Sequence, residues 1–398
     1  MVTMQSEMRP SGAGAERPAP AGSDSHPQDA PSLTPVTVGV EEEYLLVDPV
    51  SRELSTEAGA VVKEAAAELG DRVTTELTAY QIEVRTRPHQ TLAGLADDVR
   101  SLRASVTRAA ARLGLRIISS GSPVLGQQMP PPITSGPRYA RSVSTFRALD
   151  DEQSVCACHV HVGVPDLTAA LDISNHLRLW LPTLTALSAN SPFWQARDTG
   201  YASWRTVTWW RWPIAGPPPF FESRSHFEDL VDSLITTGSI MDRGGLYWDI
   251  RPSHHVPTVE VRVADAASTV NDTVLLAGAV KGLALRALQA TSEGRPAPRP
   301  QQEMLRAASW RAARDGLAGK GVDLTTGHLV PAISQVRRLL AEVEGALPLN
   351  EASYVRAQGS HLMTGGNGAD RQRAAYARRS SLNDVVDCLI SASEHTNG

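Results

Sequence analysis

The sequence has few cysteines and no large excess of charge of either sign. Its 398 residues include only Cys156, Cys158 and Cys388, too few for a disulfide framework. The formal net charge of -5 at pH 7 gives no reason to expect nucleic acid or an anionic membrane surface as a partner. Small molecules are therefore the expected ligands.

A secretory leader and long apolar runs are also lacking. Residues 1–35 have no apolar core of the kind a signal peptide needs. The longest apolar segment, "TVLLAGAVKGLALRALQA" (273–290), is interrupted by Lys281 and Arg286, whereas a helix that spans a bilayer needs about 20 apolar residues. We expect this segment to be a buried helix, and the protein to be cytoplasmic with no membrane partner.

A change in composition near residue 35 divides the chain. Residues 1–35 are rich in Pro, Ala, Gly and Ser and are expected to form a disordered tail, because they offer little surface to bury. From Val36 onward, strand-like and helical segments alternate with no internal repeat. The sequence predicts a single α+β domain over residues 36–398.

Helices are expected where apolar residues recur at helical spacing, and strands where they alternate with polar ones. The predicted helices cover residues 95–114, 170–188, the apolar segment after Asn271, 303–317, 332–347 and 382–393. The predicted strands cover residues 37–48, 79–88, 116–121, 154–165, 246–253 and 258–265.

The stretch "CACHVHVGVP" (156–165) could be a zinc site, a buried strand or one wall of a larger site. On a strand, successive side chains face opposite sides, so His159 and His161 share one face while Cys156 and Cys158 share the other. A Cys2His2 zinc site would need ligands from both faces, which a regular strand does not supply. Small buried cysteines that pack in a core explain their face better.

The same alternation recurs in three other predicted strands. Each pairs an apolar face with a face that carries two ionisable groups: Glu41 and Glu43, Glu83 and Arg85, and Glu260 and Arg262. For one strand alone, a solvated face is the ordinary explanation. Four such strands, rich in acids, histidines and arginines, favour a concave site.

The residue types in this set indicate a chemistry. Clustered carboxylates repel one another unless cations lie among them, and oxygen ligands with an imidazole suit Mg²⁺ or Mn²⁺. Arginines in the same cluster indicate an anion such as phosphate. Acids, a divalent metal and arginine are the recurring groups of phosphoryl transfer. The sequence contains no "GxxxxGK[ST]" phosphate loop, which argues against a P-loop fold.

Several longer motifs resemble one family. They are "GVEEEYLLVDP", "CHVHVGVPD", "SANSPFWQARDTGYASWR", "WPIAGPPP", "YWDIRPS", "PTVEVRVAD" and "GADRQRAAYAR". Together they resemble the carboxylate-amine ligase family called glutamate-cysteine ligase type 2, from about Val36 to about Ile390. The resemblance implies a glutamine-synthetase-like fold, in which a curved, mainly antiparallel sheet forms a funnel with helices on its outer side.

The resemblance also implies a reaction and its cofactors, ATP and Mg²⁺ or Mn²⁺. A substrate carboxylate takes the γ-phosphoryl group of ATP to become an acyl phosphate, and an amine then displaces phosphate to form an amide. Glutamate and cysteine are the nominal substrates. By motif, Glu260 and Arg262 would be catalytic, with Arg262 holding the transferring phosphate, and His161 would touch substrate or a metal. The implied metal ligands are Glu41, Glu43, Glu76, Glu83, His159 and Glu260.

Two further stretches have two interpretations each. The tryptophans of "WRTVTWWRW" (204–212), beginning with Trp204, could line a substrate pocket or fasten a long loop to the body. In "DRQRAAYARR" (370–379), Arg371 and Arg373 could bind nucleotide phosphates or lie on a solvated basic helix.

One stretch departs from the family pattern. Where the resemblance leads us to expect a sequence near "LLQSQVEVATP", this chain has "LTAYQIEVRTRP" (77–88), which adds Tyr80, Arg85 and Arg87. Arg85 shares the face of Glu83, so it could pair with a substrate carboxylate or neutralise an acid, and Tyr80 is a second candidate for substrate contact. The departure bears on the substrates more than on the ATP chemistry.

Three functions are therefore compared. The first is the ligase, which would join a small amino-acid carboxylate to an amine. The second is a phosphotransferase of the guanidine-kinase type, which would release a stable phosphorylated product. The third is a non-catalytic protein that binds metal or nucleotide. The sequence leaves homo-oligomerisation open.

Overall fold

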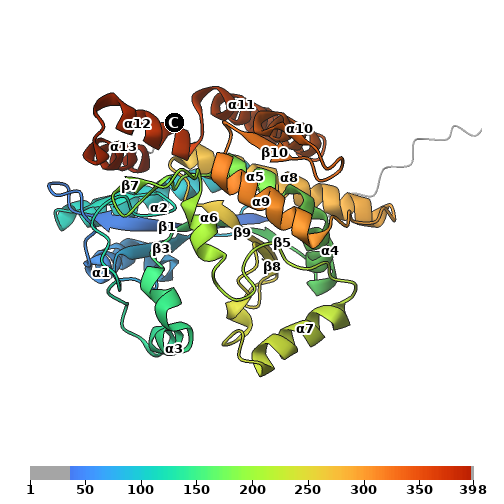
Figure 1. The fold of residues 1–398 in the computed structure, drawn as a ribbon, viewed down its shortest axis with the longest axis horizontal. Coiled ribbons are helices and arrows are strands. Elements are labelled where there is room, and N and C mark those ends of the chain that lie inside the picture. Colours follow the sequence, from blue (N-terminus) through green and yellow to red (C-terminus); the bar gives the residue numbers. More distant parts are fainter. Residues whose placement is uncertain (1–35, 396–398) are drawn as a thin grey trace, which may run out of the picture. The chain divides into compact units, whose positions relative to one another are not determined.

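One antiparallel sheet organises residues 36–395, the part of the chain that the computed structural model describes (Figure 1). The predicted tail, residues 1–35, lies outside the described residues. Every pairing in this sheet is antiparallel. The order is β2 (Val73–Thr75), β3 (Gln81–Arg85), β1 (Val38–Val47), β5 (Ala157–Gly163), β9 (Thr258–Asp265) and β8 (Ile250–Pro252), with β4 (Arg116–Ile118) paired to β1. All six predicted strands are present, and the predicted α+β class is confirmed.

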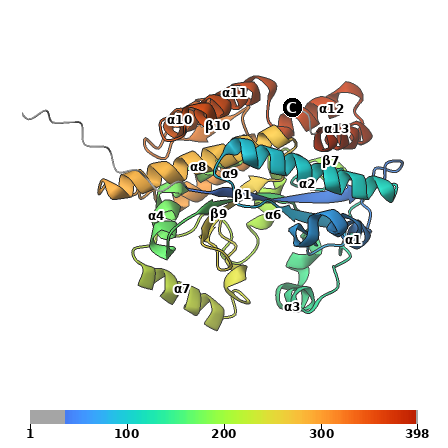
Figure 2. The same cartoon turned by 180° about the vertical axis from the view of Figure 1, so that it is seen from behind.

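Helices cover the apolar face of this sheet, as Figures 1 and 2 show from opposite sides. Valines from β1, β5 and β9 pack there in one core with apolar side chains of the covering helices. The covering helices are α2 (Leu92–Arg112), α4 (Leu167–Leu177), α5 (Leu181–Ser188) and α8 (Val270–Ser292). The long, apolar helix α8 could cross a membrane by length and composition, but 83% of its apolar window is buried inside the protein, as expected for a core helix.

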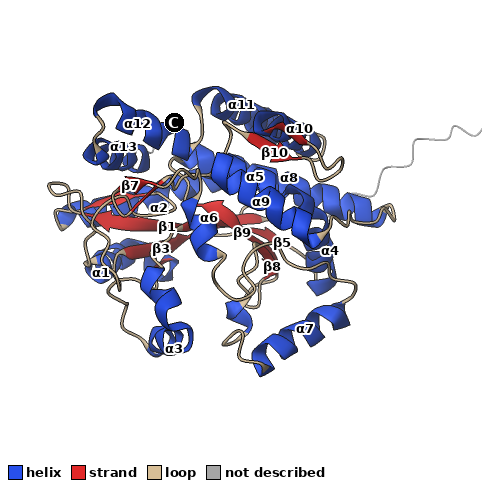
Figure 3. Ribbon diagram, in the orientation of Figure 1, coloured by secondary structure: helices blue, strands red, loops and turns tan. Residues whose placement is uncertain are grey.

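The remaining helices lie outside this layer or beyond the sheet (Figure 3). Helix α1 packs with α2 over the apolar side of β1 and β3, whereas α3 and α7 lie beyond the opposite face of the sheet (Figures 1 and 2). Their bounds are α1 (Ala58–Leu69), α3 (Pro137–Phe146), α6 (Trp204–Trp209), α7 (Arg224–Thr236), α9 (Gln302–Asp315), α10 (Ala332–Glu344), α11 (Leu349–Gly365), α12 (Gly368–Arg379) and α13 (Leu382–Glu394).

Helix ends follow local chemistry. Thr269 and Asp272 form a reciprocal capping box at the start of α8, which satisfies backbone N–H groups that have no partner within the helix. The prediction of one helix over 170–188 was wrong in one respect. The segment forms two helices, α4 and α5, joined by a 3-10 turn at Arg178–Trp180. Pro182 explains the break, since proline has no N–H to continue the α-helical pattern.

A buried ion pair joins the middle glutamate of "EEE" to the helical layer. Glu42 points away from Glu41 and Glu43, and its carboxylate accepts a hydrogen bond from Arg103 Nε at 3.0 Å and one from the Tyr44 hydroxyl at 2.6 Å. Both partners of the pair are almost completely buried. The guanidinium also donates to the carbonyls of Ala267 and Ser268, just after β9.

Removing one partner of this pair is expected to be costly. Arg103→Met leaves the Glu42 carboxylate buried without its cation, which should lower the free energy of unfolding by about 3 to 5 kcal/mol. The double variant Arg103→Met/Glu42→Leu should recover part of this loss, because no uncompensated charge remains. Urea unfolding measures both. The single variant Glu42→Leu completes the comparison. A loss of unfolding free energy in the double variant equal to the sum of the losses in Arg103→Met and Glu42→Leu would contradict this account of the pair.

Candidate active site

The face of the sheet opposite the helices carries acids, histidines and arginines. Antiparallel partners share a face, and the registers pair Glu41 with His159 and Glu43 with Glu83. On the other side of β5, His161 is opposite Glu260, so charged groups from β3 to β8 lie side by side. The ionisable residues of this face, which we call the acidic face, are Glu41, Glu43, Glu83, His159, His161, Arg251, Glu260 and Arg262, with Glu76 from the turn before β3.

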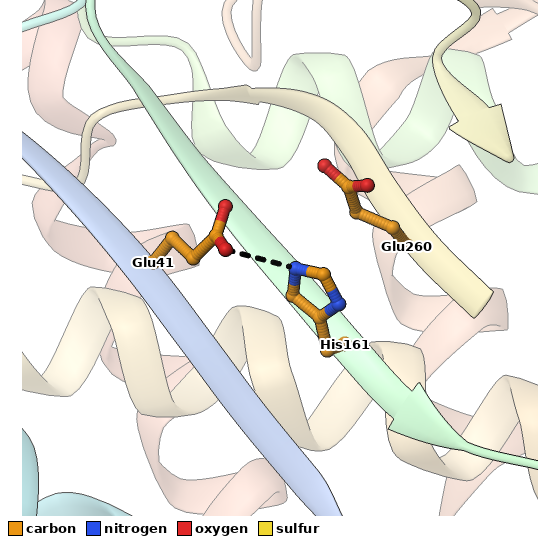
Figure 4. Close-up of side chains that lie close together, drawn as sticks. All are labelled: Glu41, His161 and Glu260. Carbon is orange, nitrogen blue, oxygen red and sulfur yellow. Dashed lines mark ion pairs between the residues drawn. The ribbon is translucent and has the colours of Figure 1, made fainter. Parts of the chain in front are cut away.

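Three of these residues form a first group of potential metal ligands. One ligand atom each from Glu41, His161 and Glu260 lies within 4.8 Å of the other two, and Figure 4 shows the side chains converging from β1, β5 and β9. His161 Nε2 is 3.4 Å from Glu41 Oε1. His159 lies beside the group, with its Nδ1 atom 3.1 Å from Glu41 Oε2 and 3.6 Å from Glu260 Oε1. The family resemblance implied His159 as a ligand, whereas the geometry brings His161 into the group.

Three more carboxylates form a second group. Ligand atoms of Glu43, Glu76 and Glu83 lie within 4.8 Å of one another. The backbone N–H of Ala157 donates to Glu43 Oε2 at 2.8 Å, and that of Leu77 donates to Glu76 Oε2 at 2.7 Å. These bonds fix two of the three carboxylates, so the group is preformed.

The two groups differ in their electrostatics. In the first, hydrogen bonds from both histidines outweigh burial and lower the pKa of Glu41, while Arg262 and Arg251 outweigh burial and hold the pKa of Glu260 well below its ordinary value. In the second, burial and the charge of Glu76 raise the pKa of Glu43 to about 8. Burial and three neighbouring acids raise the pKa of Glu83 well above its ordinary value. The positive charge near the second group is therefore too small to keep its three carboxylates ionised.

Both groups fit divalent cations. Carboxylates with one imidazole, and three carboxylates together, are donor sets that Mg²⁺ and Mn²⁺ accept. One buried histidine nitrogen on the acidic face, Nε2 of His159, has no hydrogen-bond partner within residues 36–395, and Nε2 of His161 faces Glu41 Oε1 at 3.4 Å. Burial and Arg262 lower the pKa of His159 to about 4, which keeps this ring neutral and able to act as a ligand at pH 7.

The zinc interpretation of the cysteines finds no support in the described residues. Cys156 and Cys158 are buried, and Cys158 packs in the main core. Neither belongs to a group of three potential ligands in residues 36–395. Burial raises the pKa of both thiols well above its ordinary value, which disfavours the thiolate that zinc binds.

Two arginines hold Glu260 from opposite sides. Arg262 Nη1 donates to Glu260 Oε1, and Arg251 Nε donates to Glu260 Oε2 at 2.8 Å. Arg251 also donates to the carbonyl of Gly244 at 2.7 Å. We did not single out Arg251 from the sequence, although the alternation in "WDIRPS" would have placed it beside Glu260 once the pairing of β8 and β9 was known.

Other predicted site residues lie elsewhere. Arg371 on α12 pairs with Asp272 in the first turn of α8, on the helix-covered side of the sheet. Arg373 pairs with Asp198 and donates to the carbonyl of Tyr201. The structure therefore engages both arginines in contacts away from the acidic face, because α12 packs beside α13 and not over the strands.

The predicted substrate contacts are also dispersed. Trp204 packs against Tyr201, with ring centroids 5.4 Å apart, and the tryptophan that reaches Arg262 is Trp209. Tyr80 is buried in a core cluster. Arg85 Nη2 donates to the carbonyl of Asp71 at 2.7 Å, at the exposed end of β3. A substrate role for these residues stays a prediction.

The charge imbalance of the second group predicts a pH dependence. Glu43 and Glu83 have raised pKa values, so the folded protein binds more protons than the unfolded chain until the pH passes their folded pKa. Their stabilising contribution is thus lost as the pH rises toward about 8. His159, whose pKa is lowered to about 4 from 6.5, acts in the opposite sense, but its contribution is complete above pH 6.5.

The melting temperature in the presence of a chelator should therefore fall between about pH 6.5 and pH 8.5. Excess Mg²⁺ should reduce or reverse this fall, because it binds the deprotonated carboxylates. Thermal unfolding at several pH values, with chelator or with Mg²⁺, measures both effects. A melting temperature that rises over this window without metal would contradict the assignment of raised pKa values.

Comparison with known proteins decides the family. Residues 37–388 match the model of the glutamate-cysteine ligase family 2 (GCS2). The chain belongs to this family. It is therefore a ligase, and the resemblance predicted from the motifs is confirmed.

A relative from Saccharopolyspora erythraea, named "Putative glutamate--cysteine ligase 2-1", is 46% identical over 358 residues, which are 89% of this chain and 94% of the relative. A relative from Mycolicibacterium smegmatis, "Putative glutamate--cysteine ligase 2-3", is 42% identical over 359 residues, 89% of this chain and 98% of the relative.

Solved structures show the same fold. The glutamate–cysteine ligase of Francisella tularensis, crystallised in complex with AMP, superimposes with a TM-score of 0.66 at 14% identity, covering 91% of this ligase and 89% of that chain. A bifunctional glutathione synthetase from Pasteurella multocida gives a TM-score of 0.67 at 14% identity, and the match covers 91% of this ligase and 52% of that chain. The predicted glutamine-synthetase-like fold is thereby confirmed.

Proposed function

We propose that this ligase uses ATP and a divalent cation, Mg²⁺ or Mn²⁺, to join an amino-acid carboxylate to an amine, with glutamate and cysteine as the first substrates to test. The observation that carries the proposal is the pair of acidic groups on one face of the sheet, with Arg262 bonded to Glu260 beside the first group. Its positive charge acts on both groups: it helps to hold the pKa of Glu260 well below its ordinary value against burial, and it opposes the burial that raises the pKa values of Glu43 and Glu76. The family supports carbon–nitrogen bond formation.

In the proposed reaction, an oxygen of the substrate carboxylate attacks the γ-phosphorus of ATP, and ADP leaves. The nitrogen of the amine then attacks the acyl carbon, the bond from carbon to the phosphate oxygen breaks, and the nitrogen loses a proton. Phosphate and the amide are the products. The reaction needs negative oxygens to be held close together, which depends on positioning and on nearby positive charge.

The acidic face would supply both requirements. Glu41, His161 and Glu260 would hold one cation, and Glu43, Glu76 and Glu83 would hold another, with His159 beside the first. Cations at these positions would neutralise the phosphate oxygens. Arg262 would bind the transferring phosphoryl group, because its Nε atom has no partner in the described residues and points toward no acid within hydrogen-bond distance. Arg251 would keep Glu260 ionised and in place.

The substrates are the open part of the proposal. Arg85 and Tyr80, where the chain departs from the family pattern, are our candidates for recognition of the acid. Arg371 and Arg373 remain candidates for nucleotide contact only if they leave their present partners, Asp272 and Asp198. We propose a cytoplasmic location, where ATP and amino acids are both available.

The test measures ADP and phosphate release with Mg²⁺ and ATP across a panel of amino-acid carboxylates, each with and without amines, followed by product mass. Turnover that requires both substrates and gives their dehydrated adduct supports the proposal and names the substrates. A phosphorylated acid or guanidine with no adduct would replace the ligase by a phosphotransferase.

A further inference from the structure

Arg205 is a buried arginine that contacts the strand carrying Arg262. It lies in α6, its side chain is buried, and its Nη2 atom donates to the carbonyl of Arg262 at 3.0 Å. Its Nη1 atom is 3.4 Å from the carbonyl of Val263. The backbone N–H of Arg262 donates to the carbonyl of Asp249 at 2.7 Å. The peptide groups on both sides of the Arg262 Cα atom are thus fixed by hydrogen bonds.

The start of α6 is fastened to the end of the same strand. Asp265, the last residue of β9, accepts hydrogen bonds from the hydroxyls of Ser203 and Ser191, each at 2.7 Å. Ser191 in turn accepts from the backbone N–H of Arg205 at 3.0 Å. These contacts place Arg205 against β9 with little freedom to move, because every member of the network is buried.

Trp209 completes the contact. Its ring centroid is 5.9 Å from the guanidinium carbon of Arg205 and 5.8 Å from that of Arg262, distances at which a cation interacts with an aromatic ring. Its indole N–H donates to the carbonyl of Tyr247 at 3.1 Å. One ring therefore links the two arginines.

Hydrogen bonds alone do not explain why this residue is charged. Within residues 36–395, no acid lies within 4.0 Å of the Arg205 guanidinium, and its Nε atom has no partner. Burial lowers the pKa of Arg205, against the attraction of Asp265, Glu43 and Asp249. An unpaired buried cation costs stability, whereas a shorter neutral side chain would avoid that cost but lose the bonds to the β9 carbonyls. The charge is useful if an anion binds nearby.

We propose that Arg205 is a positioning residue for Arg262, fixing the β9 backbone so that the Arg262 side chain meets the transferring phosphoryl group, and adding positive charge behind it. The inference rests on the proposed function, because it needs Arg262 to act on an anion. It assigns to the short helix α6 a role in the reaction rather than only in packing.

The test compares Arg205→Lys and Arg205→Gln with a matched control, Arg178→Gln. Arg178 is also buried and also donates to a backbone carbonyl, that of Pro218 at 2.9 Å, with no acid within ion-pair distance in the described chain. It lies in the turn between α4 and α5, two helices that cover the apolar face of the sheet. We expect Arg205→Gln to lower kcat about 100-fold, Arg205→Lys about 10-fold because it keeps the charge, and Arg178→Gln less than about twofold.

A double-mutant cycle separates positioning from general loss of structure. If Arg205 acts mainly through Arg262, adding Arg205→Gln to Arg262→Gln should slow turnover far less than the about 100-fold expected for Arg205→Gln alone. Fully additive losses, or a loss in Arg205→Gln no greater than in Arg178→Gln, would overturn the proposal. Wild-type turnover and its loss in Arg262→Gln test the proposed function itself in the same experiment.

A second readout does not depend on turnover. Hydrogen exchange of peptides covering β9 should become faster in Arg205→Gln and stay unchanged in Arg178→Gln, because only the first loses a bond to the β9 carbonyls. Unchanged exchange in β9 would overturn the positioning role even in a protein whose substrates are not yet found.

Discussion

Replacing Glu83 by glutamine is expected to make the metal-free protein more stable and to slow turnover strongly. Burial and the charges of Glu41, Glu76 and Glu43 raise the pKa of Glu83 well above its ordinary value. Ionising this carboxyl group therefore lowers the free energy of unfolding of the metal-free protein. Glutamine keeps the size and removes that cost. We expect the melting temperature in chelator to rise by at least about 2 °C, the shift that 1 kcal/mol gives in a large domain.

Activity should change in the opposite direction. Glutamine is a weaker ligand than a carboxylate, and loss of one charge from the Glu43, Glu76 and Glu83 group should lower kcat or the apparent affinity for Mg²⁺ by about 100-fold. Isothermal titration with Mg²⁺ and a steady-state assay at several Mg²⁺ concentrations measure the two effects.

The matched control is Glu42→Gln on the neighbouring strand. Glu42 has the opposite orientation and a lowered pKa, because Arg103 outweighs the effect of burial. Its replacement should destabilise the protein and leave Mg²⁺ binding nearly unchanged. If Glu83→Gln destabilises the metal-free protein as Glu42→Gln does, the acidic face is a structural network and not a cation site.

The second large effect is expected at Arg262. Arg262→Gln removes a positive charge from the acidic face and should lower kcat by about 100- to 1,000-fold, the loss typical when a group that stabilises developing negative charge is removed. Arg262→Lys should recover only part of the rate, because an ammonium does not reproduce the two parallel donors of a guanidinium.

The control for Arg262→Gln is a check that the variant protein still folds. Arg262 donates to Glu260 and contacts Trp209, so its loss could also disturb β9. Circular dichroism and thermal unfolding of Arg262→Gln should show a folded protein. A folded variant with wild-type turnover would remove Arg262 from the mechanism, and an unfolded one would make its role structural.

The sequence predicted the strands well because alternation is a local signal. Glu41, Glu43, Glu83 and Glu260 could be assigned to the polar faces of their strands from period-2 spacing alone. Which strands lie side by side is not local information. The division into two groups, with Glu76 joining from a turn, depends on the β2–β3–β1–β5–β9 order.

Residues whose neighbours could not be predicted show the same limit. His161 enters the first group because β5 pairs with β9 opposite Glu260, and no spacing within "HVHV" distinguishes it from His159. Arg371 has the right charge for phosphate, but tertiary packing gives it to Asp272. Trp209 and Trp204 lie in one aromatic stretch, and only the orientation of α6 decides which of them reaches Arg262.

Two helices were missed in the long segments that connect the strands of the main sheet. Helices α3 and α7 were not predicted, and both lie beyond the acidic face. Contacts between segments distant in sequence, such as the exposed Arg138 to Asp242 ion pair that joins α3 to the loop after α7, leave no local pattern in the sequence.

The central claim is that the acidic face transfers phosphate to a carboxylate before the amide forms. The most direct test follows oxygen. A carboxylate substrate labelled with ¹⁸O in both oxygens is turned over with ATP, Mg²⁺ and an amine, and the phosphate is analysed by mass. Our account predicts ADP and phosphate carrying one ¹⁸O atom per amide formed. Amide formation with unlabelled phosphate, or with AMP and diphosphate as products, would contradict it.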